Sequence, residues 1–85
     1  MDIKDITTRV TDIIVNKLGV NASEVTPEAH LTKDLEADSL DTVEIILAIE
    51  QDFSDFEVKI DEADQPKVQT VGDIINYLND KINNK

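Results

Sequence analysis

The sequence predicts a small all-α fold: a four-helix bundle in which a short third helix accompanies three main ones. Three segments carry apolar residues at steps of three and four, the spacing of one face of a helix. The stretch after the second of these alternates polar and apolar residues like a strand, but the chain offers no second strand to pair with it. At 85 residues, one domain over residues 1–85 with a modest core is expected.

The main helices have their own boundary signals. The first is predicted over residues 3–18, where Gly19 can adopt the left-handed conformation that ends a helix. The second is predicted to run from Ser39 to about Phe53. The last is predicted to start at Thr70, an N-cap residue with an acid three residues later, as in a capping box.

The segments between these helices are expected to be mostly irregular. Residues 20–38 form a long loop in which Thr26-Pro27-Glu28 could start one helical turn. Residues 54–60 are expected to form an extended connection, and residues 61–65 a brief helical turn that Pro66 ends. Four apolar residues are expected to hold the long loop on the core: Val20, Val25, Leu31 and Leu35.

The charge balance limits the possible partners. The chain has 19 acidic and 8 basic residues, a formal net charge of −11. Nucleic acids and anionic membranes bind basic patches, so neither is an expected partner. The charge suits docking on basic protein surfaces, although many small proteins are acidic for solubility alone.

Other compositional features exclude further classes. Without cysteine the chain has no disulfide or thiolate metal site. No apolar run approaches the roughly 20 residues of a membrane span. The N-terminal residues lack the basic and apolar regions of a secretory signal, so a soluble protein is expected.

The second helix is predicted to have two apolar faces. The side expected to pack on the core carries Ile45, Ile46, Ile49 and Phe53. The roughly opposite side carries Leu40, Val43 and Leu47, next to the acids Asp41, Glu44 and Glu50. An exposed apolar stripe edged by charge is typical of a protein-interaction surface. The alternative is a central helix that is buried all round.

Ser39 lies where the long loop gives way to the second helix. At a helix N-terminus Ser commonly caps backbone N–H groups, and the helix dipole favours a phosphate ester there. Nucleophilic catalysis by Ser39 is not expected, because it requires a base held by a third group and the only histidine, His30, has no evident partner. No catalytic carboxylate pair is assigned, since 19 acids in 85 residues give pairs by chance.

A calcium site is also not predicted. Asp34, Glu36 and Asp38 have the spacing that begins an EF-hand loop. However, Ser39 stands where that loop needs Gly, and Ile45 stands where it needs a bidentate Glu. Weak divalent-ion binding that relieves the repulsion among the acids is a hypothesis that the sequence leaves open.

The stretch from Asp34 to Glu44 closely resembles the prosthetic-group site of acyl carrier proteins, with Asp38-Ser39-Leu40 as the attachment motif. The resemblance extends to Phe53 and includes Leu18-Gly19-Val20 and residues 70–78. In that family the serine carries 4′-phosphopantetheine, whose thiol holds acyl chains as thioesters. The resemblance implies that a phosphopantetheinyl transferase, with magnesium, moves this arm from coenzyme A onto Ser39, and that the protein itself catalyses nothing.

The resemblance also implies a docking role for the second helix, whose acids would meet Arg and Lys on partner enzymes. The matching positions are the acids Asp38, Asp41, Glu44 and Glu50 and the apolar Leu40, Val43 and Leu47. It points to a monomer in fatty-acid synthesis, in the bacterial cytoplasm or in an organelle after removal of a transit peptide. Alternatives are a specialised carrier for polyketide, peptidyl, lipid A or D-alanyl transfer, and an unmodified acidic interaction bundle.

Two features depart from the family pattern. The family usually has Gly where this chain has Glu36, and a positive φ would be costly for Glu. The connection after Phe53 is also a few residues longer than the usual type. The aliphatic core could open between helices to shelter an acyl tail, or it could be ordinary packing. The longer connection affects the geometry of the entrance that such an opening would need.

Overall fold

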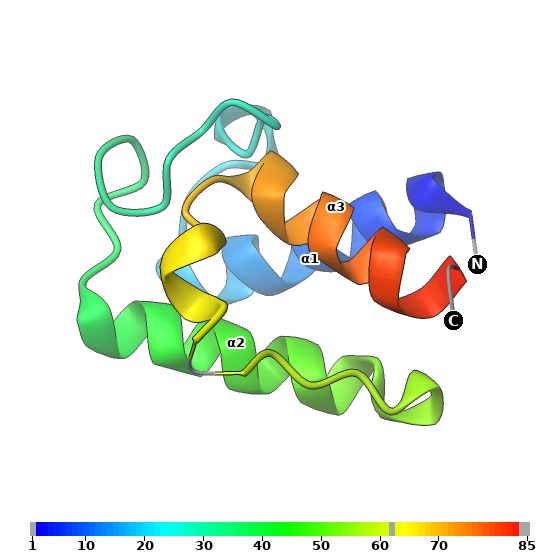
Figure 1. Ribbon diagram of the computed structural model, residues 1–85. Helices are drawn as coiled ribbons and strands as arrows, with labels where there is room; N and C mark the ends of the chain where they lie inside the picture. The colour runs from blue at the N-terminus through cyan, green and yellow to red at the C-terminus, as the bar shows by residue number, and fades with distance from the viewer. Residues whose placement is uncertain (1, 62, 84–85) are drawn as a thin grey trace.

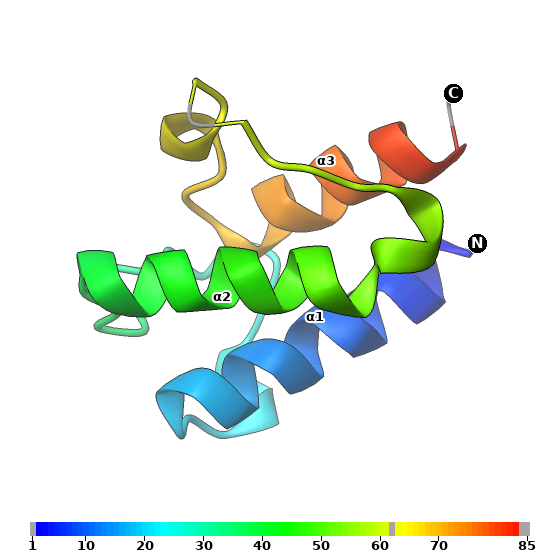
Figure 2. The ribbon, with the colours of Figure 1, turned by 90° about the horizontal axis from the view of Figure 1, so that it is seen from below.

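The computed structural model describes residues 2–61 and 63–83, and its framework is three α-helices. They are α1 (Ile3–Leu18), α2 (Ser39–Asp52) and α3 (Val71–Asn83). α1 contacts both other helices, with α3 beside it and α2 running across the pair, as the two views in Figures 1 and 2 show. The all-helical prediction is confirmed, and among the described residues no helix is long and apolar enough to cross a membrane.

The helices begin and end close to the predicted residues. Gly19 takes a φ of 68° after α1, and its N–H donates to the carbonyl of Val15 at 2.9 Å. Before α3, the Thr70 hydroxyl accepts from the Asp73 N–H at 3.1 Å, and an Asp73 carboxylate oxygen accepts from the Thr70 N–H at 3.2 Å. This reciprocal pair is the predicted capping box, which satisfies backbone donors that a helix start leaves without partners.

The core is almost wholly aliphatic. Side chains that are fully or almost fully buried come from all three helices: Ile6, Val10, Ile14, Ile45, Ile49, Phe53, Ile74 and Leu78. Three of the four residues predicted to hold the long loop, Val25, Leu31 and Leu35, are also buried, and Val20 is partly buried against the core. Fully burying one such side chain contributes about 1.5–3 kcal/mol, so these residues dominate the stability of a chain this short.

The two predicted short turns are present, and 3₁₀ helices that the sequence did not indicate lie close to them. A 3₁₀ helix occupies Ala22–Glu24, whereas Thr26 to Ala29 form a single hydrogen-bonded turn. The predicted helical turn over residues 61–65 is present, because the carbonyl of Asp61 accepts the N–H groups of Asp64 at 2.9 Å and Gln65 at 3.1 Å. The prediction that Pro66 ends it is wrong: the 3₁₀ helix Gln65–Lys67 follows, and Pro66 lies inside it. Proline fits there because its fixed φ suits a first helical turn, in which its missing N–H has no partner to lose.

The extended connection predicted over residues 54–60 is wrong for its first part, where Ser54–Phe56 form a 3₁₀ helix and Glu57 is left-handed with a φ of 56°. Residues 58–60 lie outside helices and turns. Val58 and Ile60 are buried, and Lys59 between them is exposed. The alternation that resembled a strand therefore reflects one side of an extended segment facing the core. Among the described residues, the one β-bridge is an isolated antiparallel pair between His30 and Thr70.

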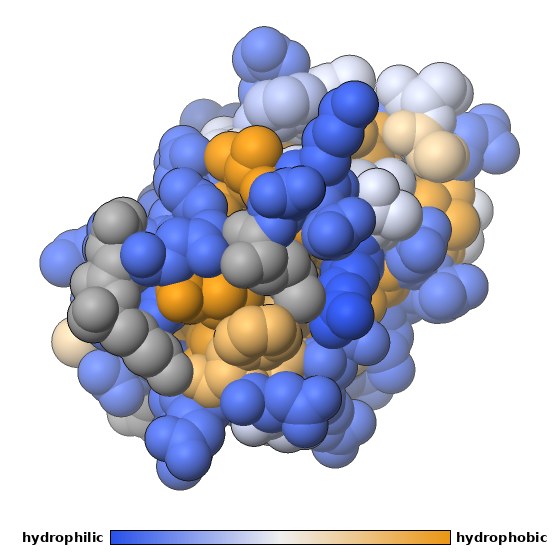
Figure 3. Space-filling view, turned by 90° about the vertical axis from the view of Figure 1, so that its right-hand side faces the viewer, coloured by the Kyte–Doolittle hydropathy of each residue, from blue (hydrophilic) through white to orange (hydrophobic). Residues whose placement is uncertain are grey.

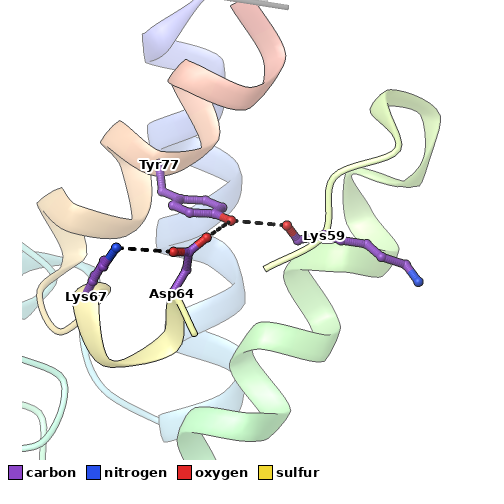
Figure 4. Close-up of polar contacts among 4 residues, drawn as sticks. All are labelled: Lys59, Asp64, Lys67 and Tyr77. Atoms are coloured by element: carbon purple, nitrogen blue, oxygen red, sulfur yellow. Dashed lines mark hydrogen bonds and ion pairs between the residues drawn. The ribbon is translucent and has the colours of Figure 1, made fainter. Parts of the chain in front are cut away.

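Two side chains fasten this connection to the helices. The Tyr77 hydroxyl of α3 lies 2.9 Å from a carboxylate oxygen of Asp64 and 3.3 Å from the carbonyl of Lys59, and it has one proton to share between these acceptors (Figure 4). Lys67 pairs with the other Asp64 oxygen at 3.5 Å. From α2, Glu50 accepts the N–H of Ile60 at 3.0 Å.

The first turn of α1 and the last turn of α3 lie at one end of the molecule, and α2 begins at the other (Figure 1). Figure 3 looks at the end that holds the first turn of α1 and the last turn of α3, where polar side chains break the apolar surface into patches. The start of α2, with Ser39, therefore lies on the far side of this view.

Tyr77 makes stability depend on pH in the alkaline range. Partial burial, the hydrogen bond to Asp64 and the charges of Asp64 and Asp61 raise the pKa of Tyr77 from 10.0 to about 12. A tyrosine whose pKa is higher in the folded state stabilises the fold below pH 10, and this contribution is lost as the pH rises through about 12. Tyr77→Phe should lower the free energy of unfolding by about 1 kcal/mol below pH 10. The variant should also lose less stability as the pH rises through about 12, because it has no tyrosine to ionise.

Urea unfolding at a series of pH values would measure this effect in both proteins. Because the chain has a single tyrosine, its ultraviolet titration reports Tyr77 alone. A tyrosine that titrates in the folded protein at its ordinary value would contradict the prediction.

Candidate functional site

Ser39 is the first residue of α2 and is exposed, as predicted, but it does not cap the helix. The cap is Asp38, whose carboxylate accepts the N–H of Asp41 at 2.8 Å. Asp41 in turn accepts the N–H of Asp38 at 3.3 Å, which completes a capping box. The expectation that the serine fills the capping position is thus corrected: an aspartate cap takes that role, so the Ser39 hydroxyl is left for other chemistry.

The electrostatic setting of Ser39 is mixed. A helix N-terminus carries partial positive charge from its unpaired N–H groups, which favours a phosphate group there. The carboxylates of Asp38 and Asp41 flank the same position and repel an anion. A phosphate ester on Ser39 would therefore be tolerated close to the helix and would not be drawn into a tight site.

The two predicted apolar faces of α2 are confirmed. Ile45, Ile46 and Ile49 are buried, while the side chains on the other side are exposed: Leu40 by 66%, Val43 by 45% and Leu47 by 52%. We call this exposed side the α2 outer face, and it consists of Leu40, Val43 and Leu47 with the acids Asp38, Asp41, Glu44 and Glu50. From Asp34 to Val58 the sequence has no basic residue, so this face carries acidic charge only.

Glu50 differs from the other acids of the outer face. Its side chain is half-buried, and its carboxylate accepts the Ile60 N–H across to the connection. Glu44 is exposed, and Asp38 and Asp41 hold each other in the capping box. Of the four acids predicted to meet partners, Glu50 therefore also has a structural task that the sequence did not indicate.

The loop before Ser39 closes on itself through backbone hydrogen bonds. The carbonyl of His30 accepts the N–H groups of Asp34 and Leu35, and the carbonyl of Leu31 accepts the N–H of Ala37 at 2.8 Å. Within this loop Glu36 has a φ of 60°. Glu36, which stands where the family usually has Gly, therefore lies at a position whose backbone is left-handed, the conformation that favours glycine.

The acids of the EF-hand-like spacing do not converge on one point. Asp34 accepts the N–H of His30 at 2.7 Å, and Asp38 caps α2. In residues 2–61 and 63–83 no three acidic or histidine side chains come together closely enough to hold a metal ion. Asp34 thus bonds the backbone of the loop, and Asp38 bonds the backbone of α2.

Sequence reasoning underestimated His30, which was expected to have no partner. Its ring contacts two backbone N–H groups of its own loop and the side chain of Gln69, which is 39 residues away. No sequence signal of helix capping or periodicity marks such a contact, because it depends on the loop meeting the start of α3.

Comparisons with known proteins show the family of this chain. The family model described as the phosphopantetheine attachment site matches residues 8–78. The chain is also 48% identical over 79 residues to a curated protein from Thermotoga maritima named acyl carrier protein. That alignment covers 93% of this chain and 94% of the relative. The family match includes Ser39 and the whole α2 outer face.

Glu36→Gly should stabilise the fold, because a non-glycine residue at φ 60° pays a left-handed penalty of about 1–2 kcal/mol that glycine avoids. The extra freedom of glycine in the unfolded chain offsets part of this, so a net gain of about 0.5–1 kcal/mol is expected in urea unfolding. The matched control is Glu44→Gly, on the exposed side of α2, which should cost about 1 kcal/mol. A loss of stability in both variants would show that the loop does not need glycine at position 36.

Proposed function

We propose that Ser39 bears the 4′-phosphopantetheine arm of this chain, which belongs to the acyl carrier protein family. The chain is a carrier and not an enzyme. When the arm is bound, its thiol supplies the chemistry by holding acyl groups as thioesters. The observation that carries the assignment to Ser39 is its exposed position at the start of α2, with the capping role filled by Asp38.

The residues around Ser39 fit such an arm. The serine hydroxyl points from the first helical residue, where the helix dipole favours a phosphodiester. Asp38 and Asp41 repel the same phosphodiester, so the arm would stay solvated and mobile and not fold onto the helix. That mobility suits a group that has to enter the active sites of several enzymes.

The α2 outer face is the proposed docking surface. Leu40, Val43 and Leu47 would contact an apolar patch on each partner, and the acids would meet Arg and Lys around it. Asp38, the cap of α2, and Asp41 and Glu44 within the helix would take this role. Glu50 would contribute at the edge of the face with the part of its carboxylate that Ile60 does not occupy. Such charge complementarity gives fast association that weakens with salt.

The partners proposed for this face are a phosphopantetheinyl transferase and the basic-patched enzymes of fatty-acid synthesis in a bacterial cytoplasm. The name of the Thermotoga relative supports the general role and specifies no pathway. Carriers for polyketide, peptidyl, lipid A or D-alanyl transfer are the alternatives. We also propose that residues 1–85 form one domain, monomeric in solution, in which the turn Gln65–Lys67 takes the place of the short helix of a four-helix bundle.

Incubating the purified apo protein with coenzyme A, magnesium and a broad-specificity phosphopantetheinyl transferase tests the assignment. Intact mass should rise by one phosphopantetheine, and peptide mapping should locate it on Ser39. Ser39→Ala should give no adduct, while Ser54→Ala, a second exposed serine, should be modified like the wild type. An adduct on the Ser39→Ala protein, or none on folded wild type, would rule the assignment out.

Glu44→Lys tests the docking surface. Reversing this exposed charge should lower kcat/KM for phosphopantetheine transfer by about tenfold at low ionic strength, mainly through KM. The matched control is Glu28→Lys, which makes the same charge change in the long loop. The difference between the two variants should shrink at high salt, where exposed charges are screened within a few ångströms. Equal rates for both variants at low salt would count against the outer face as the docking surface.

A further inference from the structure

The loop that leads into α2 is organised around the ring of His30. We call residues 30–37 the His30 loop. The Nδ1 atom of the ring accepts the N–H of Thr32 at 3.1 Å and the N–H of Lys33 at 3.2 Å. The backbone of the same residue is also engaged, because its N–H donates to Asp34 at 2.7 Å and its carbonyl accepts from Asp34 and Leu35. His30 thus forms hydrogen bonds with several backbone groups of the His30 loop.

These contacts favour one tautomer of the neutral ring. An Nδ1 atom that accepts two N–H groups carries no proton, so the neutral ring has its proton on Nε2. That nitrogen lies 3.3 Å from the side-chain oxygen of Gln69, which can accept it. The amide nitrogen of Gln69 donates to the carbonyl of Pro66 at 2.8 Å, which turns the oxygen toward the histidine. Each partner therefore supports the same tautomer.

The ring also stands where the loop meets the start of α3. Next to it, the Leu31 N–H donates to the carbonyl of Gln69 at 2.9 Å, and the Val71 N–H donates to the carbonyl of Ala29 at 3.0 Å. The Gly72 N–H donates to the carbonyl of Pro27 at 2.9 Å, and a Cβ on Gly72 would lie only 2.9 Å from that oxygen. The His30 loop is therefore anchored on one side to a rigid helix start.

On its other side the loop reaches Ser39. Ala37 is buried, and its N–H donates to the carbonyl of Leu31, the neighbour of His30, at 2.8 Å. Asp38 follows as the cap of α2, and Ser39 comes next. The direction in which the chain enters α2 is thus set by a turn whose inner donors bond to the His30 ring.

We propose that His30 is a positioning residue for the modification of Ser39. In its Nε2–H form, the ring holds the His30 loop in the one arrangement that presents the serine hydroxyl correctly to the transferase. This inference rests on the proposed function, namely that Ser39 is the modified residue. It assigns no contact between His30 and the transferred group.

Three variants separate the roles of the two ring nitrogens. His30→Asn offers a side-chain oxygen near the position of Nδ1 and should keep the two backbone bonds, whereas His30→Gln offers one near Nε2 and should lose them. His30→Ala loses both contacts. Loss of a cap of this kind should speed hydrogen exchange of the Thr32 and Lys33 amides about fivefold in the Gln and Ala variants and leave the Asn variant close to wild type.

Nitrogen NMR of the wild-type ring should show the Nε2–H tautomer in the neutral form. A neutral ring with its proton on Nδ1, or equal amide exchange in all three variants, would overturn the inference whatever the transferase does. These readouts use the purified protein alone and do not depend on the proposed function.

Transfer kinetics test the positioning role itself. With coenzyme A and transferase, kcat should fall about tenfold in His30→Ala and His30→Gln, with KM unchanged, and His30→Asn should restore it. A variant that only unfolds more often would instead raise the apparent KM at unchanged kcat, because its unfolded fraction does not react. Wild-type kcat in His30→Ala, with Ser39 modified, would overturn this inference alone, whereas wild type without an adduct would overturn the proposed function as well.

Discussion

Burial of one side of α2 against α1 and the shared aliphatic core is the interaction on which the other features depend. Ile45, Ile49 and Phe53 are removed from water on that side, and Arg9 of α1 covers the Phe53 ring at 5.5 Å while it pairs with Asp52 at 3.6 Å. A chain of 85 residues has no further layer to cover the opposite side of the same helix. The core that holds α2 in place thus also leaves its second apolar stripe in water, next to acids only. Folding and the exposure of the proposed docking surface have the same cause.

The start of α2 shows a division of work between adjacent residues. Asp38 and Asp41 satisfy each other's backbone N–H groups, which is a structural role. Because these two residues cap the helix, Ser39 can be its first residue without capping it. The same two carboxylates place negative charge beside the serine, where in the proposed function they would both repel the anionic arm and attract basic partners. Asp38 and Asp41 therefore both cap the helix and set the charge around its start.

Much of this arrangement could be predicted from the sequence, and the reasons are local. The three helices follow from apolar spacing and from end signals such as Gly19 and the Thr70–Asp73 box, which act within a few residues. The two faces of α2 follow from helical geometry alone. Contacts between segments far apart in the chain could not be predicted in the same way: His30 with Gln69, Glu50 with Ile60, and Tyr77 with Asp64. Pro66 was misjudged because a proline can stop a helix or begin one, and the choice depends on where the connection is held.

The placement of the chain ends has a practical consequence. The first turn of α1 and the last turn of α3 share one end of the molecule, and α2 begins at the other (Figure 1). A tether, a fluorophore or a fused domain joined at either end would therefore project away from Ser39 and from the first turn of the outer face. The protein could be immobilised on a surface or joined to enzymes in a larger polypeptide while the start of α2, the proposed attachment site, stays oriented toward solvent. The fold would therefore allow the protein to be attached to a larger structure while it acts as a carrier.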